Sequence, residues 1–273
     1  MIKRFSRRGG ALLLCFALIC GMLAGCSDVR NMVSGVAVAG EFPVEVAGVT
    51  ISARPQKVVV LSPSLADVVL ALGYETQLTA GAQECTQESL RDLNKLSRDD
   101  AQAIMDAGPD LVLLDAESGA SASALEEAGI TVLSIAPATD REDFERLYSE
   151  VSSALAGGGA GHVEGMRVAQ DIFLTLDAIN LIVPSDRVTT ACYLYDLDSS
   201  AVTGDMFGST IMTYSGVTNV FKSLQGGMYD FDTLRISNPN AIFCPPGLKD
   251  QILGDSRFQD SQAVKDNKVF EMD

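Results

Sequence analysis

The stretch KVVVLSPSLADVVLALG, residues 57–73, changes its hydrophobic period midway, and this change indicates the fold class. Residues 58–61 form a continuous apolar run, which is typical of a strand buried on both faces. Across residues 65–72 the apolar positions recur at helical spacing, until a glycine stops the pattern. Ser64 and Asp67 are spaced as a capping box, so we expect Ser64 to cap this helix. Strand, tight turn and helix therefore follow one another directly.

The same alternation continues along the chain. We expect helices at residues 99–107 and 122–128, and apolar strands at residues 111–114 and 130–135. Strands that alternate with short helices favour a parallel sheet with helices on both faces. We therefore predict one α/β lobe over residues 41–141.

The second half repeats this plan. The segment NPNAIFC from Asn238 echoes GPDLVLL from Gly108, and NKVF from Asn267 echoes GITV from Gly129. The two halves are thus predicted to be divergent copies of one arrangement, with the second lobe spanning residues 181–273.

Residues 142–180 carry apolar positions along one helix face and are predicted to form the long helix that connects the lobes. The glycine cluster at 157–161 interrupts it. A phosphate-binding loop would need a strand immediately before the glycines, and here a helix precedes them, so a break between two helices is the better interpretation. The predicted fold class is α/β, with two Rossmann-like lobes joined by one long helix and a ligand cleft between them.

The N-terminus has the pattern of an export signal. Residues 1–25 contain four basic and no acidic side chains, followed by an apolar run that is too short and too glycine-rich to favour a spanning helix. The run ends in Leu-Ala-Gly-Cys, which resembles the lipobox of bacterial lipoproteins. That resemblance implies cleavage before Cys26, a lipid on its thiol, and a membrane-anchored, outward-facing protein. Residues 26–40, rich in small and polar side chains, are predicted to be a flexible tether.

Composition excludes several classes of function. The chain has 20 basic and 36 acidic residues and a net charge of −16, and loss of the four basic residues of the leader would bring it near −20. Such a surface repels nucleic acid. With one histidine, His162, a histidine-rich metal site is excluded, and no Gly-x-Ser-x-Gly motif supports a hydrolase. We predict neither a catalytic site nor a cofactor.

Cys192 and Cys244 lie in apolar runs that are predicted to be strands. One disulfide is possible in an oxidising compartment, and two buried free thiols are the alternative. The absence of a Cys-x-x-Cys pair in the sequence leaves a redox or zinc motif without support.

Five segments in order resemble the iron-siderophore and vitamin B12 class of solute-binding proteins that serve ABC importers. The segments are VVLSPSLADVVLALG (59–73), AIMDAGPDLVLL (103–114), LEEAGITVLSI (125–135), SNPNAIFC (237–244) and AVKDNKVF (263–270). The resemblance implies a bilobed fold with a stiff helical spine, and partners consisting of a permease and its ATPase. It also implies that an iron-siderophore, a corrinoid or a haem-like molecule binds between the lobes.

Candidate ligand contacts lie where strands are expected to end. Backbone N–H groups near Ser62 and Ser64 are placed to receive an anionic or carbonyl group, although the two hydroxyls also suit simple helix capping. Further loops are expected at residues 81–87 and 115–121, the second beginning with Asp115. Loops at 195–207 and 226–231 belong to the other lobe. Their aromatic side chains offer flat contact surfaces and are Tyr195, Phe207, Tyr229 and Phe231.

The resemblance also implies one acidic docking residue on each lobe, near the start of the helix before the Pro-Asp-like strand. The matching positions are Gln102 and Asp232, and Asp100 lies beside the first. Members of the class usually continue past the strand matching residues 268–272 into a closing helix. We therefore expect a minimal or truncated second lobe with exposed apolar sheet surface. A tethered sensor or scaffold that keeps the fold without transport is the alternative function.

Overall fold

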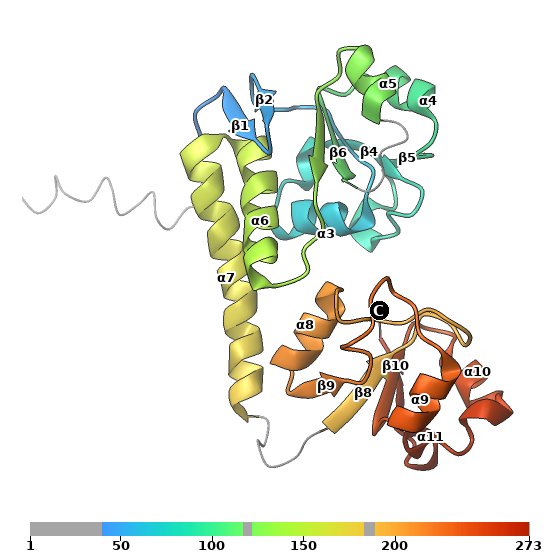
Figure 1. Ribbon diagram of the computed structural model, residues 1–273. Helices are drawn as coiled ribbons and strands as arrows, with labels where there is room; N and C mark the ends of the chain where they lie inside the picture. Colours follow the sequence, from blue (N-terminus) through green and yellow to red (C-terminus); the bar gives the residue numbers. More distant parts are fainter. Residues whose placement is uncertain (1–39, 117–121, 183–188, 273) are drawn as a thin grey trace, which may run out of the picture. The chain divides into compact units, whose positions relative to one another are not determined.

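The computed structural model describes residues 40–116, 122–182 and 189–272, and these belong to one compact unit that starts at Gly40 (Figure 1). The predicted leader, the lipid site at Cys26, most of the tether, and residues 117–121 of the loop after Asp115 lie outside the described residues. Within the described part of the chain, no helix is both long and apolar enough to cross a membrane.

The first half of the unit is built on a five-stranded parallel sheet with the strand order β5-β4-β3-β6-β7. Its strands are β3 (Val58–Val60), β4 (Leu78–Ala82), β5 (Asn94–Leu96), β6 (Leu111–Asp115) and β7 (Val132–Ile135). Helices cover both faces: α3 (Pro63–Ala71) and α6 (Arg141–Ala156) pack on one, and α4 (Ala101–Asp106) and α5 (Ala122–Glu127) on the other. A small antiparallel hairpin, β1 (Val44–Val46) and β2 (Val49–Ile51), packs beside α6.

Helix α3 begins two residues earlier than the capping box predicts. Ser62 is the N-cap, and its Oγ accepts a hydrogen bond from the Leu65 N–H at 3.2 Å. Pro63 then occupies the first helical position, where its fixed φ fits and its missing N–H is no loss. The expected cap at Ser64 is therefore wrong, and Asp67 instead accepts a hydrogen bond from the Gln87 side chain at 2.9 Å.

The predicted connecting segment is a pair of helices, α6 and α7 (Gly158–Ile182), which break at Gly157 as the glycine cluster indicates. They pack closely against each other along their length (Figure 1). Glycines permit this approach, because a Cβ at Gly161 would lie 2.5 Å from the Ser152 carbonyl oxygen. Only α7 continues towards the second half of the chain.

The second half forms a four-stranded parallel sheet with the strand order β11-β10-β8-β9. The strands are β8 (Thr189–Tyr193), β9 (Val217–Asn219), β10 (Ala241–Cys244) and β11 (Val269–Glu271). The helices are α8 (Phe207–Tyr214), α9 (Phe231–Ser237), α10 (Lys249–Gly254) and α11 (Gln262–Lys265). The predicted α/β fold with two lobes is confirmed, and the two parallel sheets are linked by two long helices where one was predicted. The predicted ligand cleft between the lobes stays a prediction.

The two sheets are copies of one plan, as the sequence echoes predict. The central strands β3 and β8 each pair with the next strand in the chain, β4 or β9, on one side and with a later strand, β6 or β10, on the other. Asp110 accepts a hydrogen bond from the Lys57 N–H at 3.0 Å, and Asn240 accepts one from the Thr190 N–H at the same distance. Each of these side chains ties the strand it precedes to the start of the central strand.

Candidate ligand-binding site

The predicted ligand loops follow the carboxyl ends of parallel strands, which is where open α/β sheets bind their ligands. In the first lobe these are the segments after β3, β4 and β6, and in the second lobe the segments after β8 and β9. The chemistry available at these ends depends on which of the predicted side chains remain exposed.

Ser62 and Ser64, at the turn between β3 and α3, differ in accessibility. The Ser62 side chain is fully buried and its hydroxyl caps α3, so the capping interpretation describes the contact that is present. Ser64 is exposed in the first turn of the helix. A ligand group that approaches this turn would therefore meet the Ser64 hydroxyl and the Ser64 N–H, because Pro63 has no N–H and the Leu65 and Ala66 N–H groups are bonded to Ser62.

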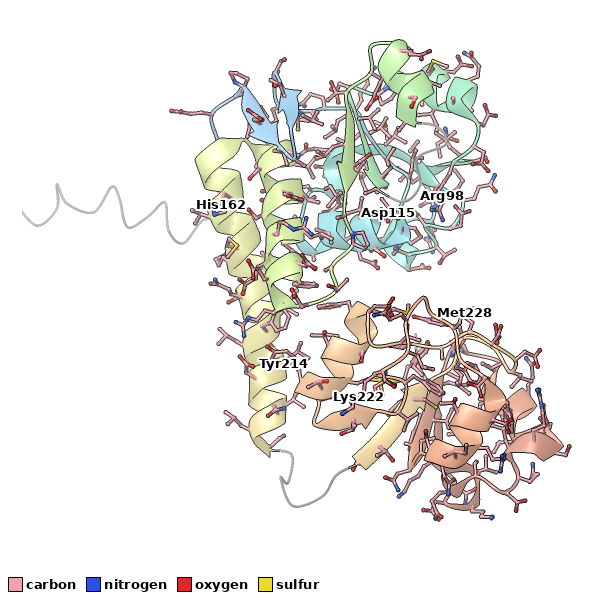
Figure 2. All side chains as sticks on the ribbon, viewed as in Figure 1. Arg98, Asp115, His162, Tyr214, Lys222 and Met228 are labelled. Carbon is pink, nitrogen blue, oxygen red and sulfur yellow. The ribbon has the colours of Figure 1, made fainter. Side chains whose placement is uncertain are left out.

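Asp115 is the last residue of β6 and is half-buried. Figure 2 labels it in the first lobe together with Arg98, which follows β5. The Nε atom of Arg98 lies 3.4 Å from Glu84 Oε2, and the ammonium group of Lys95 donates a hydrogen bond to the Cys85 carbonyl at 2.5 Å. Charges of both signs thus gather on the loops after β4, β5 and β6, which suits a polar ligand group more than a purely apolar one.

Tyr195 follows β8 and keeps 45% of its surface exposed. Its ring centroid lies 5.1 Å from that of Tyr193, and partial burial raises the pKa of the Tyr195 hydroxyl. The phenol is therefore a neutral hydrogen-bonding group on a flat, half-exposed ring. Of the four predicted aromatic contacts, Tyr195 is the one whose ring is most accessible in the structure.

The other three aromatic residues pack within the protein. Phe207 begins α8 and stacks on Phe144 of α6, with ring centroids 4.8 Å apart and an 8° interplanar angle. Tyr229 is buried against Phe221, at 5.1 Å. Phe231 is half-buried and meets the Phe258 ring edge-on at 5.1 Å. These contacts position α8, α9 and the loop before α9, so a ligand role for the three rings stays a prediction.

Met228 is a candidate contact that the sequence analysis did not name. It lies in the predicted 226–231 loop, next to buried Tyr229, and keeps 55% of its surface exposed (Figure 2). A flexible thioether of this kind adapts to the shape of an apolar ligand. The aromatic residues that follow it, Tyr229 and Phe231, were the predicted contacts, and nothing in the sequence pattern indicated that Met228 is the exposed residue.

Two carboxylates shape the second-lobe loops and were also missed. Asp196 Oδ1 accepts hydrogen bonds from the N–H groups of Ser199, Ser200 and Asp198 at 2.8–3.0 Å, and these bonds lower the Asp196 pKa. The Asp205 pKa is lowered by the Thr203 hydroxyl and the Gly226 N–H, which both donate to its carboxylate. Aspartates that precede serine-rich turns are a known sequence signal for such loops.

The predicted docking positions occupy matching places in the two lobes. Asp100 is the N-cap of α4, and its carboxylate accepts a hydrogen bond from the Ala103 N–H at 3.0 Å. Gln102 is exposed on α4, and Asp232 is exposed at the start of α9, where it pairs with Arg235 at 3.1 Å. Because α4 and α9 each precede the strand that pairs with the central strand, the two positions are related by the internal repeat.

The remaining predictions concern cysteines and metals. Cys192 and Cys244 are buried free thiols, so the disulfide alternative is wrong, and burial raises the pKa of both. His162 is exposed, and its Nδ1 lies 2.5 Å from Ser149 Oγ on α6. Among the described residues there is no group of three histidine, cysteine or acidic side chains that suits a metal ion.

Comparison with known proteins identifies the architecture. The chain is 25% identical over 277 residues to the ABC transporter substrate-binding lipoprotein YvrC of Bacillus subtilis (strain 168), with 92% of this chain and 86% of that protein covered. Among solved structures, the periplasmic haem-binding protein BhuT, in complex with two haems, has a TM-score of 0.68 and 21% identity, covering 81% of this chain and 90% of BhuT. This is the fold of the ABC transporter substrate-binding proteins.

A second solved structure of this substrate-binding protein fold is the periplasmic vitamin B12 binding protein BtuF of Vibrio cholerae, with a TM-score of 0.64 and 15% identity over 80% of this chain and 88% of BtuF. No family model matches the chain. The resemblance predicted from five sequence segments is confirmed for the class, and the similar proteins are substrate-binding or vitamin-binding proteins. Sequence similarity at this level leaves the ligand to be proposed.

Proposed function

We propose that the chain is the extracytoplasmic substrate-binding lipoprotein of an ABC importer. The observation that carries the proposal is the pairing of two parallel sheets of one plan, each with its loops at the carboxyl ends of its strands, in a chain that matches a substrate-binding lipoprotein over 92% of its length. The ligand would bind between the loops of the two lobes and be delivered to a membrane permease with its ATPase.

The ligand class we favour is an iron-siderophore, a corrinoid or a haem-like molecule. BhuT is a haem-binding protein and BtuF is a vitamin B12 binding protein. In this chain the exposed groups at the strand ends are a serine, a half-buried aspartate and a tyrosine, namely Ser64, Asp115 and Tyr195. These groups would orient a large chelate by hydrogen bonds, with Met228 as an adaptable apolar contact.

A thermal-shift screen of residues 27–273 against cobalamin, cobinamide, haem and a set of ferric siderophores tests the ligand class. We expect one of them to raise the melting temperature, because a ligand at 100 times its Kd stabilises the folded state by about 2.7 kcal/mol. Tyr195→Ala should weaken the binding of that ligand. Ile236→Ala, which changes an exposed residue of α9, should leave the ligand affinity unchanged. A well-folded protein that none of the compounds stabilises would count against import.

The proposed anchor is a lipid on Cys26, which would keep the binding protein near its permease and raise its local concentration there. Cys26→Ser should abolish labelling by a radioactive fatty acid and release the protein from the membrane fraction. Cys15→Ser is the matched control and should leave labelling intact. Labelling that persists in the Cys26→Ser protein would contradict the anchor.

Docking on the permease is proposed to use Asp232 and the Asp100–Gln102 region, the two positions related by the internal repeat. Asp232→Lys should reduce ligand uptake by cells without changing ligand affinity in solution, since docking and binding use separate surfaces. Asp260→Lys reverses another exposed, ion-paired charge elsewhere on the second lobe and serves as the control. Equal loss of uptake in both variants would mean that overall charge, and not this position, matters.

A further inference from the structure

Arg257 joins three segments of the second lobe. It lies in the short helix η3 (Ser256–Phe258), between α10 and α11. Its Nη1 atom lies 3.0 Å from Asp198 Oδ1, in the loop after β8, although the two residues are 59 positions apart in the sequence. Its guanidinium carbon also lies 5.4 Å from the ring centroid of Phe231, the first residue of α9. Arg257 therefore contacts both the loop after β8 and the start of α9.

Asp255 fixes the orientation of this guanidinium group. The Nε and Nη2 atoms of Arg257 donate hydrogen bonds to Asp255 Oδ2 at 2.9 and 2.7 Å, and the Arg257 backbone N–H donates to Oδ1 at 2.8 Å. The bonds with Asp255, and then the bond with Asp198, raise the pKa of Arg257, so it stays charged. With its Nε side held by Asp255, the planar group reaches Asp198 through Nη1 and presents its face to the Phe231 ring.

The loop after β8 is also bonded to the segment that precedes α9. The Tyr229 N–H donates a hydrogen bond to the Ser199 carbonyl at 2.7 Å, and the Tyr229 hydroxyl donates to the Asp196 carbonyl at 3.4 Å. These bonds connect the loop to the residue before the N-cap of α9. The contacts of Arg257 extend this connection by one step, because they reach the first turn of the helix itself.

We propose that Arg257 is a positioning residue whose guanidinium plane couples the loop after β8 to the first turn of α9. That loop begins with the half-exposed Tyr195, and the first turn of α9 contains Asp232. The inference rests on the proposed function, in which Tyr195 contacts the ligand and Asp232 contacts the permease. A ligand that displaces the loop would change the first turn of α9 through Arg257, so occupancy of the ligand site would alter the docking surface.

Amide hydrogen exchange, measured residue by residue by NMR on residues 27–273 without any ligand, tests this coupling. The aspartate of the ion pair has 79% of its side chain exposed, so the pair adds little to global stability and its effect has to be measured locally. The hydrogen-bonded N–H of Ser199 reports on the loop, and that of Thr233 reports on the first turn of α9. The N–H of Ile242 in β10 reports on opening of the whole lobe.

Removal of the arginine should loosen the loop without loosening the lobe. Arg257→Ala should speed exchange at Ser199 by about two- to threefold, because the loop loses its ion pair. Exchange at Ile242 should change by less than about 1.5-fold. Arg235→Ala is the matched control, since it removes an arginine that pairs with Asp232 within α9, and it should leave exchange at Ser199 unchanged. Equal acceleration at Ser199 and Ile242 would mean that Arg257 only stabilises the lobe as a whole, and the proposal would be wrong.

A double-mutant cycle measures the coupling itself. Asp198→Ala, a change in the loop, should speed exchange at Thr233 in α9 by about twofold while Arg257 is present. In the Arg257→Ala protein the same change should alter exchange at Thr233 by less than about 1.2-fold. Asp250→Ala, which removes an exposed acidic residue of α10, is the matched control and should leave exchange at Thr233 unchanged in both proteins. An effect of Asp198→Ala that is absent from α9, or that persists without Arg257, would overturn the proposal.

Arg257→Lys separates the planar shape of the side chain from its charge. An ammonium group keeps the charge but does not replace the fork that bonds Asp255 and Asp198 while its face lies on Phe231. Exchange in the first turn of α9 should therefore be as fast as in Arg257→Ala, and a slow rate restored by lysine would overturn the proposal. No ligand or permease enters these measurements, so failure of the coupling and failure of the proposed function are distinguishable.

Discussion

The same three positions of the repeated sheet are covered in one lobe and open in the other. In the first lobe they are Val60, Leu113 and Leu133, all fully buried under α3 and α6. In the second lobe the corresponding residues are aromatic: Tyr193, Phe243 and Phe270. Their rings shield one another, since the Phe243 and Phe270 centroids lie 5.8 Å apart and stack at a 30° angle.

The second sheet differs from the first in how far the described helices cover its two faces. Its other face packs Cys192, Ile242 and Val269, each at most 1% exposed, against α9, α10 and α11. The first sheet has helices on both faces, so removing a side chain there opens a cavity within a closed core. In the second sheet the same change on the open face only alters a surface. The two lobes should thus respond differently to equivalent substitutions.

The largest expected difference is between Leu133→Ala and Phe270→Ala. Leu133→Ala removes a fully buried side chain and should lower the free energy of unfolding by about 2–5 kcal/mol, because a cavity remains. Phe270→Ala should cost only about 1 kcal/mol, because 44% of the ring is already in water. Urea unfolding followed by circular dichroism measures both. Equal losses would show that the open face is covered in solution.

A second pair of variants tests whether the hydrogen bonds accepted by Asp110 and Asn240 contribute equally to the stability of the two lobes. Asp110→Ala removes the acceptor of the Gln56 and Lys57 N–H groups, and Asn240→Ala removes the acceptor of the Thr190 N–H. Each should lower the free energy of unfolding by about 1–2 kcal/mol, since a backbone donor at the start of the central strand loses its partner. Asp92→Ala, whose side chain is 95% exposed, is the control. A loss in one lobe alone would break the equivalence.

Lowering the pH should destabilise the loop after β8 but not the turn after β3. Hydrogen bonds from Ser199, Ser200 and Asp198 lower the Asp196 pKa below its ordinary value of 3.8. A carboxylate with a depressed folded-state pKa stabilises the loop above its unfolded pKa, and this contribution is lost as the pH falls through the folded-state pKa. The matching turn after β3 is capped by the neutral hydroxyl of Ser62.

Amide hydrogen exchange at residues 198–200, corrected for the intrinsic rate, measures this difference between pH 6 and pH 2. Protection should fall at the acidic end in the unmodified protein. Asp196→Asn should show lower protection at neutral pH and little further change on acidification. Protection that falls equally in the Asn variant would trace the effect to general acid unfolding and not to Asp196.

Local patterns in the sequence predicted the elements that depend on local physics. The apolar run at 58–61 and the helical spacing after it predicted β3 and α3, because burial on both faces and on one helix face leaves a clear period in the sequence. The helix cap was misplaced by two residues, since both Ser62 and Ser64 have capping side chains and only the structure shows that Pro63 occupies the first helical position. Element type was thus easier to predict than element boundaries.

Local sequence patterns could not predict contacts between segments that are distant in the chain. Phe207, Tyr229 and Phe231 follow strands as ligand residues do, but their rings pack on Phe144, Phe221 and Phe258, which lie elsewhere in the sequence. An aromatic residue after a strand serves a core and a binding site equally well until its partners are known. Similarly, the apolar runs around Cys192 and Cys244 predicted strands but did not show whether the two cysteines form a disulfide.

The smallest expected effect concerns the turn between α4 and β6 and the matching turn between α9 and β10. Gly108 after α4 and Asn238 after α9 occupy the same place in the repeat, and both have a positive φ, 62° and 40° respectively. Gly108→Asn should change the free energy of unfolding by less than about 1 kcal/mol, because both residues adopt this left-handed conformation at little cost. Asn238→Gly also removes the acceptor of the Gln262 N–H, which lies 2.8 Å from Asn238 Oδ1, and should lower the free energy of unfolding by about 1 kcal/mol. Asn238→Val should cost about 1–2 kcal/mol more than Asn238→Gly, since a β-branched residue resists a positive φ. If Asn238→Val cost no more than Asn238→Gly, the turn after α9 would not need a residue suited to positive φ, and the internal repeat would extend to the strands but not to the turns that precede them.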